Sequence, residues 1–286
     1  MVINMKETET KGSIFSLGAG IIIAFAMYSK IPMPHISWKE KNMRYAICAF
    51  PLVGMVIGLL FLLWNRLCMI SAVPVEITET GIGSILQNRI PEWTRICFGA
   101  AIPLIITGGI HVDGFMDTCD ALHSYQEKER KLEILKDPHI GAFSVIMLLL
   151  ASLIGLGSLG MIQSEKQIML MSLVFVLGRI LSGLSVVTFP NAKREGTLYT
   201  FSSLAHKRTV RVILALELLL CMTGLLLIDW KIGGTMILVS GCLFLYYWYR
   251  SKTSFGGITG DLAGWFLCLC EILNCLVIGI VGMLLR

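Results

Sequence analysis

The sequence predicts an all-α membrane protein, a bundle of about seven or eight transmembrane helices. Of the 286 residues, 55% are apolar and only 15% are charged, whereas a typical soluble domain carries roughly 25% charged residues. Several apolar runs of about 17 to 22 residues contain no charge or a single charge, and a helix of that length crosses a bilayer. These observations argue against a soluble helical protein.

Eight apolar runs account for the predicted helices. Their approximate limits are residues 13–29, 45–63, 96–110, 141–161, 167–188, 212–228, 232–249 and 263–285. The first run ends in YSKIPMP rather than at a small-residue cleavage site, so we expect it to remain as a membrane segment. The third run is short for a span, and a helix could continue it into the polar stretch that follows. Because no repeat or low-complexity segment divides the chain, we expect one integral-membrane domain over residues 1–286.

Basic residues in the loops predict the orientation of the helices. If the eight runs alternate, the loops after the first, third, fifth and seventh runs share a side and carry fifteen Lys or Arg residues. The opposite side, termini included, carries eight. The excess places the first set of loops in the cytoplasm, in a multi-pass protein of the cell membrane. The net charge of +5 fits anionic lipid or an anionic substrate, and we expect no nucleic-acid partner.

The stretch GGIHVDGFMDTCDALH, residues 108–123, begins the third loop and contains three aspartates. Asp113, Asp117 and Asp120 are spaced i, i+4 and i+7, which places them within an arc of about 60° on a helix. Three carboxylates on one stripe repel one another unless a cation lies between them. Hard oxygen ligands suit Mg²⁺ held together with substrate phosphates, where the ion neutralises charge and aligns an attacking hydroxyl. The alternative is a solvated acidic helix end, but the recurrence of aspartate on a single face favours a metal site at the cytoplasmic side.

Five further residues could take part in this site. His111 could orient a phosphate or act as a general base, or it could be an interfacial histidine bonded to the backbone. Lys136, in KDPHIGAF, could hold a phosphate or anchor the chain at the membrane surface. Arg179 lies within an apolar run, where a charge faces a polar cavity or an ion-pair partner. Arg194, in FPNAKREGTL, could contact phosphate. Asp261, in SFGGITGDLAGW, could complete a metal shell or cap the last helix, and we favour the cap.

These motifs, in this order, resemble those of the cobalamin synthase family, also called the adenosylcobinamide-GDP ribazoletransferases. The similar segments are YSKIPMP (28–34), FPLVGMVIG (50–58), TGGIHVDGFMDTCDAL (107–122), KERKLEILKDPHIGAF (128–143) and GGITGDLAG (256–264). The acidic segment is the most specific of them, and the ordered set extends through most of the chain. Family members generally have glycine where Ala121 stands and often alanine where Cys119 stands, and both departures leave the three aspartates intact.

The resemblance implies an Mg²⁺-dependent transferase that completes the nucleotide loop of cobalamin. Adenosylcobinamide-GDP and α-ribazole (or its 5′-phosphate) would give adenosylcobalamin (or its 5′-phosphate) and GMP. Such phosphoryl-type transfer depends on positioning and charge neutralisation. The expected metal ligands are Asp113, Asp117 and Asp120. These three aspartates and His111 are the expected catalytic residues. The expected substrate-binding residues are Lys136, Arg179, Arg194 and Asp261. An oligomer is compatible with the sequence.

Two other functions explain the sequence less well. A CDP-alcohol phosphotransferase also uses a spaced aspartate array at the membrane surface, but its signature needs an alanine–arginine pair that DGFMDTCDALHS lacks. A secondary transporter would show internal repeat symmetry and a central carboxylate. No such repeat is visible here, and the acidic cluster lies at a predicted helix boundary.

Overall fold

The apolar runs fold into long helices, and no strand is present in the part of the chain that the structure describes. The structure is a computed structural model, and it describes residues 18–70 and 90–285. Residues 13–17 of the first predicted run lie outside it, and a helix over Gly18–Tyr28 represents the rest of that run. The other elements are α2 (Glu40–Met43), the 3-10 helix η1 (Ala46–Ala49), α3 (Phe50–Ile70), α4 (Glu92–Thr107), α5 (Ile110–His123), α6 (Lys128–Ile134), α7 (Ala142–Gly160), α8 (Glu165–Thr188), α9 (Thr197–Leu204), α10 (Lys207–Ile228), α11 (Trp230–Phe255) and α12 (Gly260–Leu284).

The described residues contain six or seven candidate membrane-crossing helices, which overlaps the predicted seven or eight at its lower value. Within the described residues, six segments are long and apolar enough to cross a membrane. They are Glu40–Met69, which contains α3, and the helices α7, α8, α10, α11 and α12. Helices α4 and α5 make a seventh span if the two are counted together. The predicted all-α membrane bundle is therefore confirmed.

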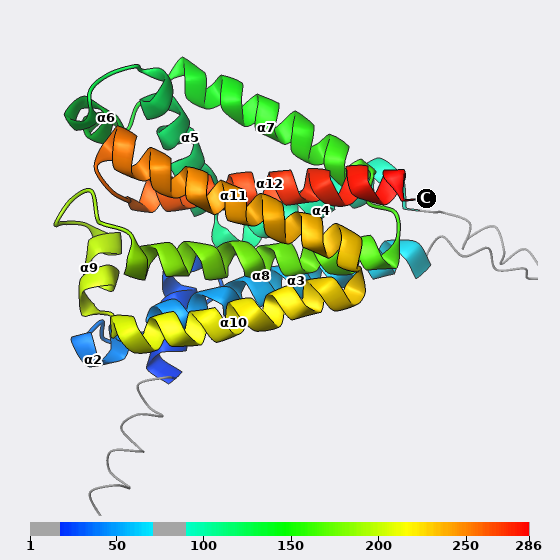
Figure 1. Ribbon diagram of the computed structural model, residues 1–286, viewed down its shortest axis with the longest axis horizontal. Coiled ribbons are helices and arrows are strands. Elements are labelled where there is room, and N and C mark those ends of the chain that lie inside the picture. The colour runs from blue at the N-terminus through cyan, green and yellow to red at the C-terminus, as the bar shows by residue number, and fades with distance from the viewer. Residues whose placement is uncertain (1–17, 71–89, 286) are drawn as a thin grey trace, which may run out of the picture.

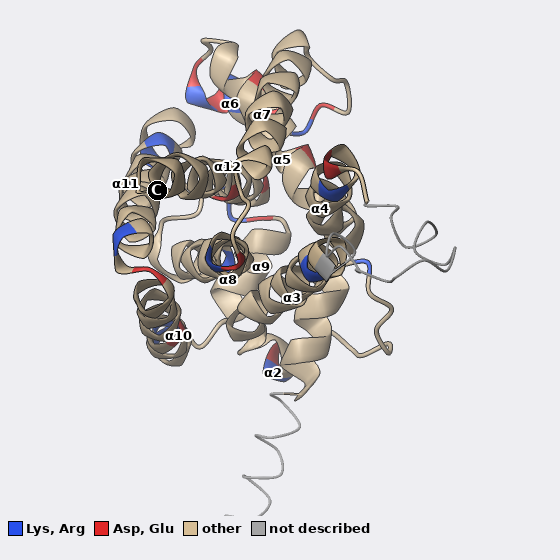
Figure 2. Cartoon of the chain, turned by 90° about the vertical axis from the view of Figure 1, so that its right-hand side faces the viewer, with Lys and Arg blue, Asp and Glu red and all other residues tan. Residues whose placement is uncertain are grey.

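Helix α8 lies at the centre of the bundle, with α3, α10, α11 and α12 around it (Figure 2). In its most apolar 18-residue window 78% of the residues are buried, against 11% for α7 at the outside. Glycines on α3 allow the closest approach to α8, because a Cβ on Gly54 would overlap the carbonyl of Phe175 and one on Gly58 that of Ser172. Small residues of this kind let membrane helices pack closely where lipid supplies no hydrophobic driving force.

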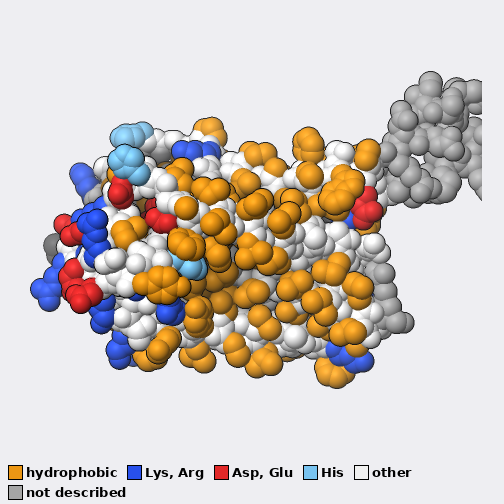
Figure 3. All heavy atoms as spheres, turned by 90° about the horizontal axis from the view of Figure 1, so that it is seen from above, with side chains coloured by type: hydrophobic (Ala, Val, Ile, Leu, Met, Phe, Trp, Pro, Cys, Tyr) orange, Lys and Arg blue, Asp and Glu red, His pale blue; other side chains and the backbone are white. Residues whose placement is uncertain are grey.

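The loops predicted to share a side lie together at one end of the bundle. Figure 1 shows α2, α6, α9 and the connection between α11 and α12 at its left-hand end, which we call the site end. The connection between α7 and α8 and the C-terminal end of α12 lie at the opposite end. Charged side chains gather at the site end, whereas hydrophobic side chains cover the middle of the molecule (Figure 3). The shared side is thus confirmed, and its cytoplasmic orientation stays a prediction.

A sharp bend separates α4 from α5, the helix that carries the aspartates. The two helices meet at 93°, with Gly108 and Gly109 between them. Both glycines have positive φ angles, 65° and 79°, which residues with a Cβ rarely adopt. The Lys30 backbone N–H donates to the Ile106 carbonyl at 2.7 Å and ties the end of α4 to the first helix. The expected helical continuation of the third run therefore exists, but it turns across the bundle.

The approach of α3 to α8 can be tested with one alanine. Gly54→Ala places a methyl group where the Phe175 carbonyl lies, and we expect overpacking to lower the free energy of unfolding by about 1–3 kcal/mol. Thermal unfolding of the purified protein in detergent measures this effect. Gly241→Ala, on α11 with nothing within 4 Å of the added Cβ, is the matched control. Equal melting temperatures for the two variants would contradict the packing argument.

Candidate functional site

Two glycines bring α5 and α12 into direct backbone contact. A Cβ on Gly114 of α5 would lie 2.7 Å from the Cα of Asp261, and a Cβ on Gly264 of α12 would lie 2.8 Å from the carbonyl oxygen of His111. Any larger residue at either position would push the helices apart. The crossing therefore sets the first turn of α12 directly beside the acidic stripe of α5.

The crossing adds a fourth carboxylate to the three predicted from spacing. Asp113, Asp117 and Asp120 all lie on α5, as expected. The carboxylates of Asp113, Asp261 and Asp120 are each close enough to repel the negative charge of Asp117. None of the ion pairs formed among the described residues involves these four side chains. The cluster is therefore a concentration of negative charge that forms no salt bridge with the described residues.

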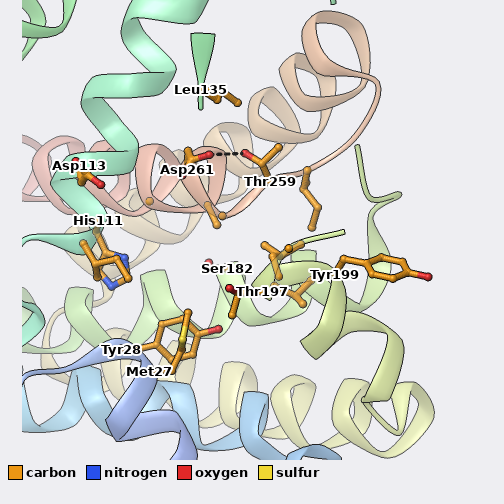
Figure 4. Close-up of a pocket in the computed structure, with 18 of the residues that line it drawn as sticks. Met27, Tyr28, His111, Asp113, Leu135, Ser182, Thr197, Tyr199, Thr259 and Asp261 are labelled. Atoms are coloured by element: carbon orange, nitrogen blue, oxygen red, sulfur yellow. Dashed lines mark hydrogen bonds between the residues drawn. The ribbon is translucent and has the colours of Figure 1, made fainter. Parts of the chain in front are cut away.

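A cavity of about 590 Å³ opens beside this cluster, between α5, α8, α9 and α12. Four of the predicted site residues line it, namely His111, Asp113, Lys136 and Asp261. Figure 4 shows Asp113 and Asp261 on one side of the cavity and Tyr28 on the opposite side. The volume is in the usual range for a small-molecule site, roughly 300–1,000 Å³.

Asp117 and Asp120 continue the stripe away from the cavity lining. Asp120 packs against the loop before α7, where a Cβ on Gly141 would overlap its carboxylate. This contact joins the acidic stripe to the segment KDPHIGAF, which the sequence predicts to belong to one site. Arg194 is exposed on the loop between α8 and α9 and does not line the cavity. Its role as a phosphate ligand stays a prediction.

Two loops that the sequence analysis singled out separately form one layer over the cavity. Residues Asn191 and Ile258 form a parallel β-bridge, in which the Ala192 N–H donates to the Ile258 carbonyl at 3.0 Å and the Ile258 N–H to the Pro190 carbonyl at 2.8 Å. Gly257 permits this contact, because a Cβ there would lie 2.5 Å from the Ala192 nitrogen. The bridge holds the loop after α8 and the loop before α12 in a fixed relation.

Basic side chains from two loops face the carboxylates. Lys136 and Lys193 both line the cavity, and Lys136 donates to the Glu195 carboxylate at 2.8 Å. This bond raises the pKa of Lys136 and lowers that of Glu195. Burial lowers the pKa of Lys193, and the nearby Lys136 charge adds to the effect. The cavity thus has acids on α5 and α12 and two lysines on loops, a distribution that suits an anion accompanied by a cation.

The expectation that Asp261 caps the last helix is wrong. Thr259 is the N-cap, and its hydroxyl accepts a hydrogen bond from the Leu262 N–H at 3.2 Å. The Thr259 hydroxyl is also 3.4 Å from an Asp261 carboxylate oxygen, to which it donates. Asp261 instead occupies the first turn of α12 with its carboxylate at the cavity, which agrees with its other predicted role beside the substrate.

Arg179 lies below the cavity and is fully buried. It forms an ion pair with Glu271 of α12 at 3.0 Å and donates to the Phe175 carbonyl at 2.8 Å. Its guanidinium carbon is 6.0 Å from the centre of the Phe50 ring, which does line the cavity. The structure therefore shows the structural ion pair that the sequence left open, one residue layer from the site. A direct role of Arg179 in substrate binding stays a prediction.

The donor chemistry of the cluster fits a magnesium ion that shares its coordination with a substrate. Within the described residues, no three Asp, Glu, His or Cys side chains are arranged to hold a metal ion as they stand. Mg²⁺ is usually held by one or two carboxylates together with substrate phosphates and water. Asp113 and Asp261, on facing helices at the cavity, offer that number of hard oxygen ligands.

Several lining residues were missed in the sequence. Lys193 stands next to Arg194, and nothing in an irregular loop indicates which of two adjacent side chains points inward. Tyr28, Phe50 and Ser182 lie in apolar runs, where they are typical core residues. Only the close approach of their helices to α5 reveals that they face a cavity.

Comparisons with known proteins agree with the motifs. The family model described as cobalamin-5-phosphate synthase matches residues 20–279. A protein of Lachnoclostridium phytofermentans named adenosylcobinamide-GDP ribazoletransferase is 41% identical over 251 residues, which is 88% of this chain and 89% of that protein. A Clostridium botulinum protein of the same name is 30% identical, over 91% of this chain and 96% of that protein. No solved structure matches.

The buried ion pair below the cavity gives a clear stability prediction. Arg179→Leu leaves the partly buried Glu271 without its partner, and we expect a loss of about 3 kcal/mol in the free energy of unfolding. The double variant Arg179→Leu/Glu271→Leu removes both charges and should regain most of that loss. Thermal unfolding in detergent measures both. If the double variant melts no higher than the single one, the pair is not the reason for the instability.

Proposed function

This chain belongs to the cobalamin-5-phosphate synthase family, and we propose that it transfers the adenosylcobinamide phosphate of adenosylcobinamide-GDP to α-ribazole or its 5′-phosphate. The products would be adenosylcobalamin, or its 5′-phosphate, and GMP. The observation that carries the proposal is a cavity that combines carboxylates from two helices with two lysines, within a chain that the family model matches from residue 20 to 279.

The proposed reaction exchanges one phosphorus–oxygen bond for another. A hydroxyl oxygen of α-ribazole attacks the phosphorus that is bonded to cobinamide. The bond from that phosphorus to the bridging oxygen of the diphosphate breaks, and GMP leaves with the bridging oxygen. The hydroxyl proton passes to a carboxylate of the acidic stripe and from there to water. No redox step is involved, so positioning and electrostatics account for the catalysis.

The charged residues of the cavity have different proposed roles in the reaction. Lys136 and Lys193 would hold the phosphate oxygens of the leaving GMP, because ammonium groups bind phosphate as point charges. Asp113, Asp117 and Asp261 would hold Mg²⁺. The ion would neutralise charge on the diphosphate and align it with the attacking hydroxyl. Glu195 pairs with Lys136 in this structure, and the incoming phosphate would replace Glu195 as the partner of Lys136.

The same charges support a cytoplasmic active site. The loops that reach the site end carry fifteen of the described Lys and Arg residues, against four at the opposite end, namely Arg66, Arg95, Lys166 and Lys231. Basic loops are retained in the cytoplasm, where a nucleotide substrate is available. We therefore infer that α6, α9 and the two bridged loops face the cytoplasm in the cell membrane.

A direct assay tests the proposed function. Purified full-length protein is incubated with adenosylcobinamide-GDP and α-ribazole, with Mg²⁺ or with excess EDTA, and GMP is quantified. We expect GMP to appear with both substrates and Mg²⁺ and to fall to background with EDTA. Formation of GMP at the same rate without α-ribazole would indicate a hydrolase and contradict the transfer reaction.

The metal assignment predicts the effect of two conservative changes. Asp113→Asn and Asp117→Asn remove a negative charge with little change in shape, and we expect GMP release to fall by about 100-fold or more. The rise in melting temperature that Mg²⁺ gives the wild-type protein should be lost as well. Asp137→Asn is the control, because Asp137 lies at the same end and pairs with exposed His139 instead. Full activity of both the Asp113→Asn and the Asp117→Asn variants would remove the metal role.

The lysines predict a specific dependence on pH. Lys193→Gln should raise the KM for adenosylcobinamide-GDP by about tenfold, or ~1.4 kcal/mol, through loss of a phosphate contact. The pKa of Lys193 is lower than that of an ordinary lysine, so raising the pH removes its charge earlier. The alkaline fall in kcat/KM of the wild-type protein should therefore move to higher pH in Lys193→Gln. Lys128→Gln, an exposed lysine on α6, should leave both KM and profile unchanged.

A further inference from the structure

The part of the cavity formed by membrane helices differs from the part formed by loops. Its lining includes Tyr28 at the end of the first helix, Phe50 at the start of α3, His111 on α5 and Ser182 on α8. The Tyr28 and Phe50 rings lie 4.1 Å apart between centroids, and the Phe50 and His111 rings 6.0 Å apart. This region therefore presents aromatic surface, and the Asp113 and Asp261 carboxylates of α5 and α12 border it in the same cavity.

Three neutral polar groups in this region have no partner. The Nε2 atom of His111 is buried and forms no hydrogen bond in the described structure, and the residue is only 9% exposed. No hydrogen bond from a described residue reaches the hydroxyl of Tyr28 or that of Ser182. Figure 4 shows Tyr28, His111 and Ser182 around the open space of the cavity. A buried polar atom without a partner costs free energy, so the His111 Nε2 atom is placed for a ligand rather than for the fold, and the two hydroxyls lie around the same open space.

The lysines of the cavity come from its loops. Lys136, Lys193 and Glu195 come from the loops at the site end. A ligand that fills the whole cavity therefore meets lysines at the loops, the Asp113 and Asp261 carboxylates on the helices, and an aromatic surface at Tyr28 and Phe50. The part of the ligand at the aromatic surface needs a flat ring system with few polar atoms, since only three neutral groups are available to bond it.

We propose that Tyr28, Phe50, His111 and Ser182 form the binding subsite for the heterocyclic base of the acceptor, α-ribazole. The inference rests on the proposed function and deepens it. A benzimidazole-type base joined to ribose through one ring nitrogen keeps a single acceptor nitrogen, which matches one N–H of His111. Its remaining surface is apolar and suits the rings of Tyr28 and Phe50.

The alternative occupant, guanine, fits this subsite less well. Guanine presents an N–H, an amino group and a carbonyl along one edge, and its donors call for carboxylate or carbonyl acceptors, whereas Tyr28, His111 and Ser182 supply none and the neighbouring Asp113 is assigned to Mg²⁺. The corrin macrocycle is excluded by size, because about 590 Å³ accommodates only a ligand of ordinary drug size. Asp113 follows His111 by two residues and lines the same cavity, so a base held at His111 leaves its ribose hydroxyls near the carboxylates.

Binding measurements test this subsite independently of catalysis. Purified full-length protein is titrated calorimetrically with α-ribazole alone and, in a second arm, with GMP alone. We expect His111→Phe and Tyr28→Leu to weaken α-ribazole binding by about tenfold or more while leaving GMP binding within about twofold. His111→Gln keeps an N–H donor and should bind α-ribazole nearly as the wild-type protein does. His139→Phe, an exposed histidine outside the cavity, is the control.

Steady-state kinetics then distinguish the role of His111 from that of a general base. The proposal predicts a higher KM for α-ribazole and an unchanged KM for adenosylcobinamide-GDP in His111→Phe and Tyr28→Leu. A fall in kcat with α-ribazole binding intact would make His111 a general base and overturn the subsite. Weakened GMP binding instead would place guanine there and overturn it as well. Melting temperatures show whether each variant is folded.

The proposed function and the subsite can fail independently. Wild-type protein that binds α-ribazole, but releases no GMP from adenosylcobinamide-GDP, would contradict the transfer reaction and leave the binding subsite standing. Wild-type protein that releases GMP, with α-ribazole binding insensitive to His111 and Tyr28, would contradict the subsite alone.

Discussion

The backbone contact between α5 and α12 determines where every charged group of the site lies. Gly114 meets the main chain of Asp261, and Gly264 meets that of His111, so the helices cross at a distance that no side chain could tolerate. Because the contact is made by backbone, it fixes the rotation of each helix as well as their separation. The acidic stripe of α5 and the first turn of α12 then face the same cavity, and residues from distant parts of the chain become one site.

The bend between α4 and α5 allows α5 to cross α12. If α4 and α5 formed one straight helix, that helix would run roughly along the bundle. Only part of the acidic stripe would then face the interior of the bundle. The 93° break at two glycines instead sends α5 across the bundle to meet α12. A break in a membrane helix is tolerated where the freed backbone is covered by protein. Here the first helix supplies that cover through the hydrogen bond from the Lys30 N–H to Ile106.

Local periodicity predicted the features that a single helix determines, and missed those that depend on contacts between segments. The spacing of Asp113, Asp117 and Asp120 placed them on one face, and the loop charges placed the relevant loops at one end. The capping role of Asp261 was wrong because Thr259, two residues earlier, is an equally competent cap, and only backbone angles distinguish them. Lys193 was missed because its inward direction follows from the bridge between two loops, which no local pattern encodes.

The arrangement of charge also explains why the acidic cluster can exist in a membrane protein at all. Like charges repel most strongly where water is scarce, and an unpaired carboxylate deep in a bilayer is costly. The acidic residue inside the bundle and those near the site end differ in whether they have an ion-pair partner. Glu271, inside the bundle, is paired with Arg179, whereas the four aspartates lie toward the site end without any ion-pair partner in the described chain. If lysines neutralised all four aspartates, the cluster would keep no net negative charge to attract a cation. Lys136 and Lys193 instead line the cavity from its loops, Lys136 is paired with Glu195, and the aspartates form no salt bridge with either lysine. A site built this way keeps four aspartates without a salt bridge beside two lysines, which is the distribution of charge that the proposed cation and anion require.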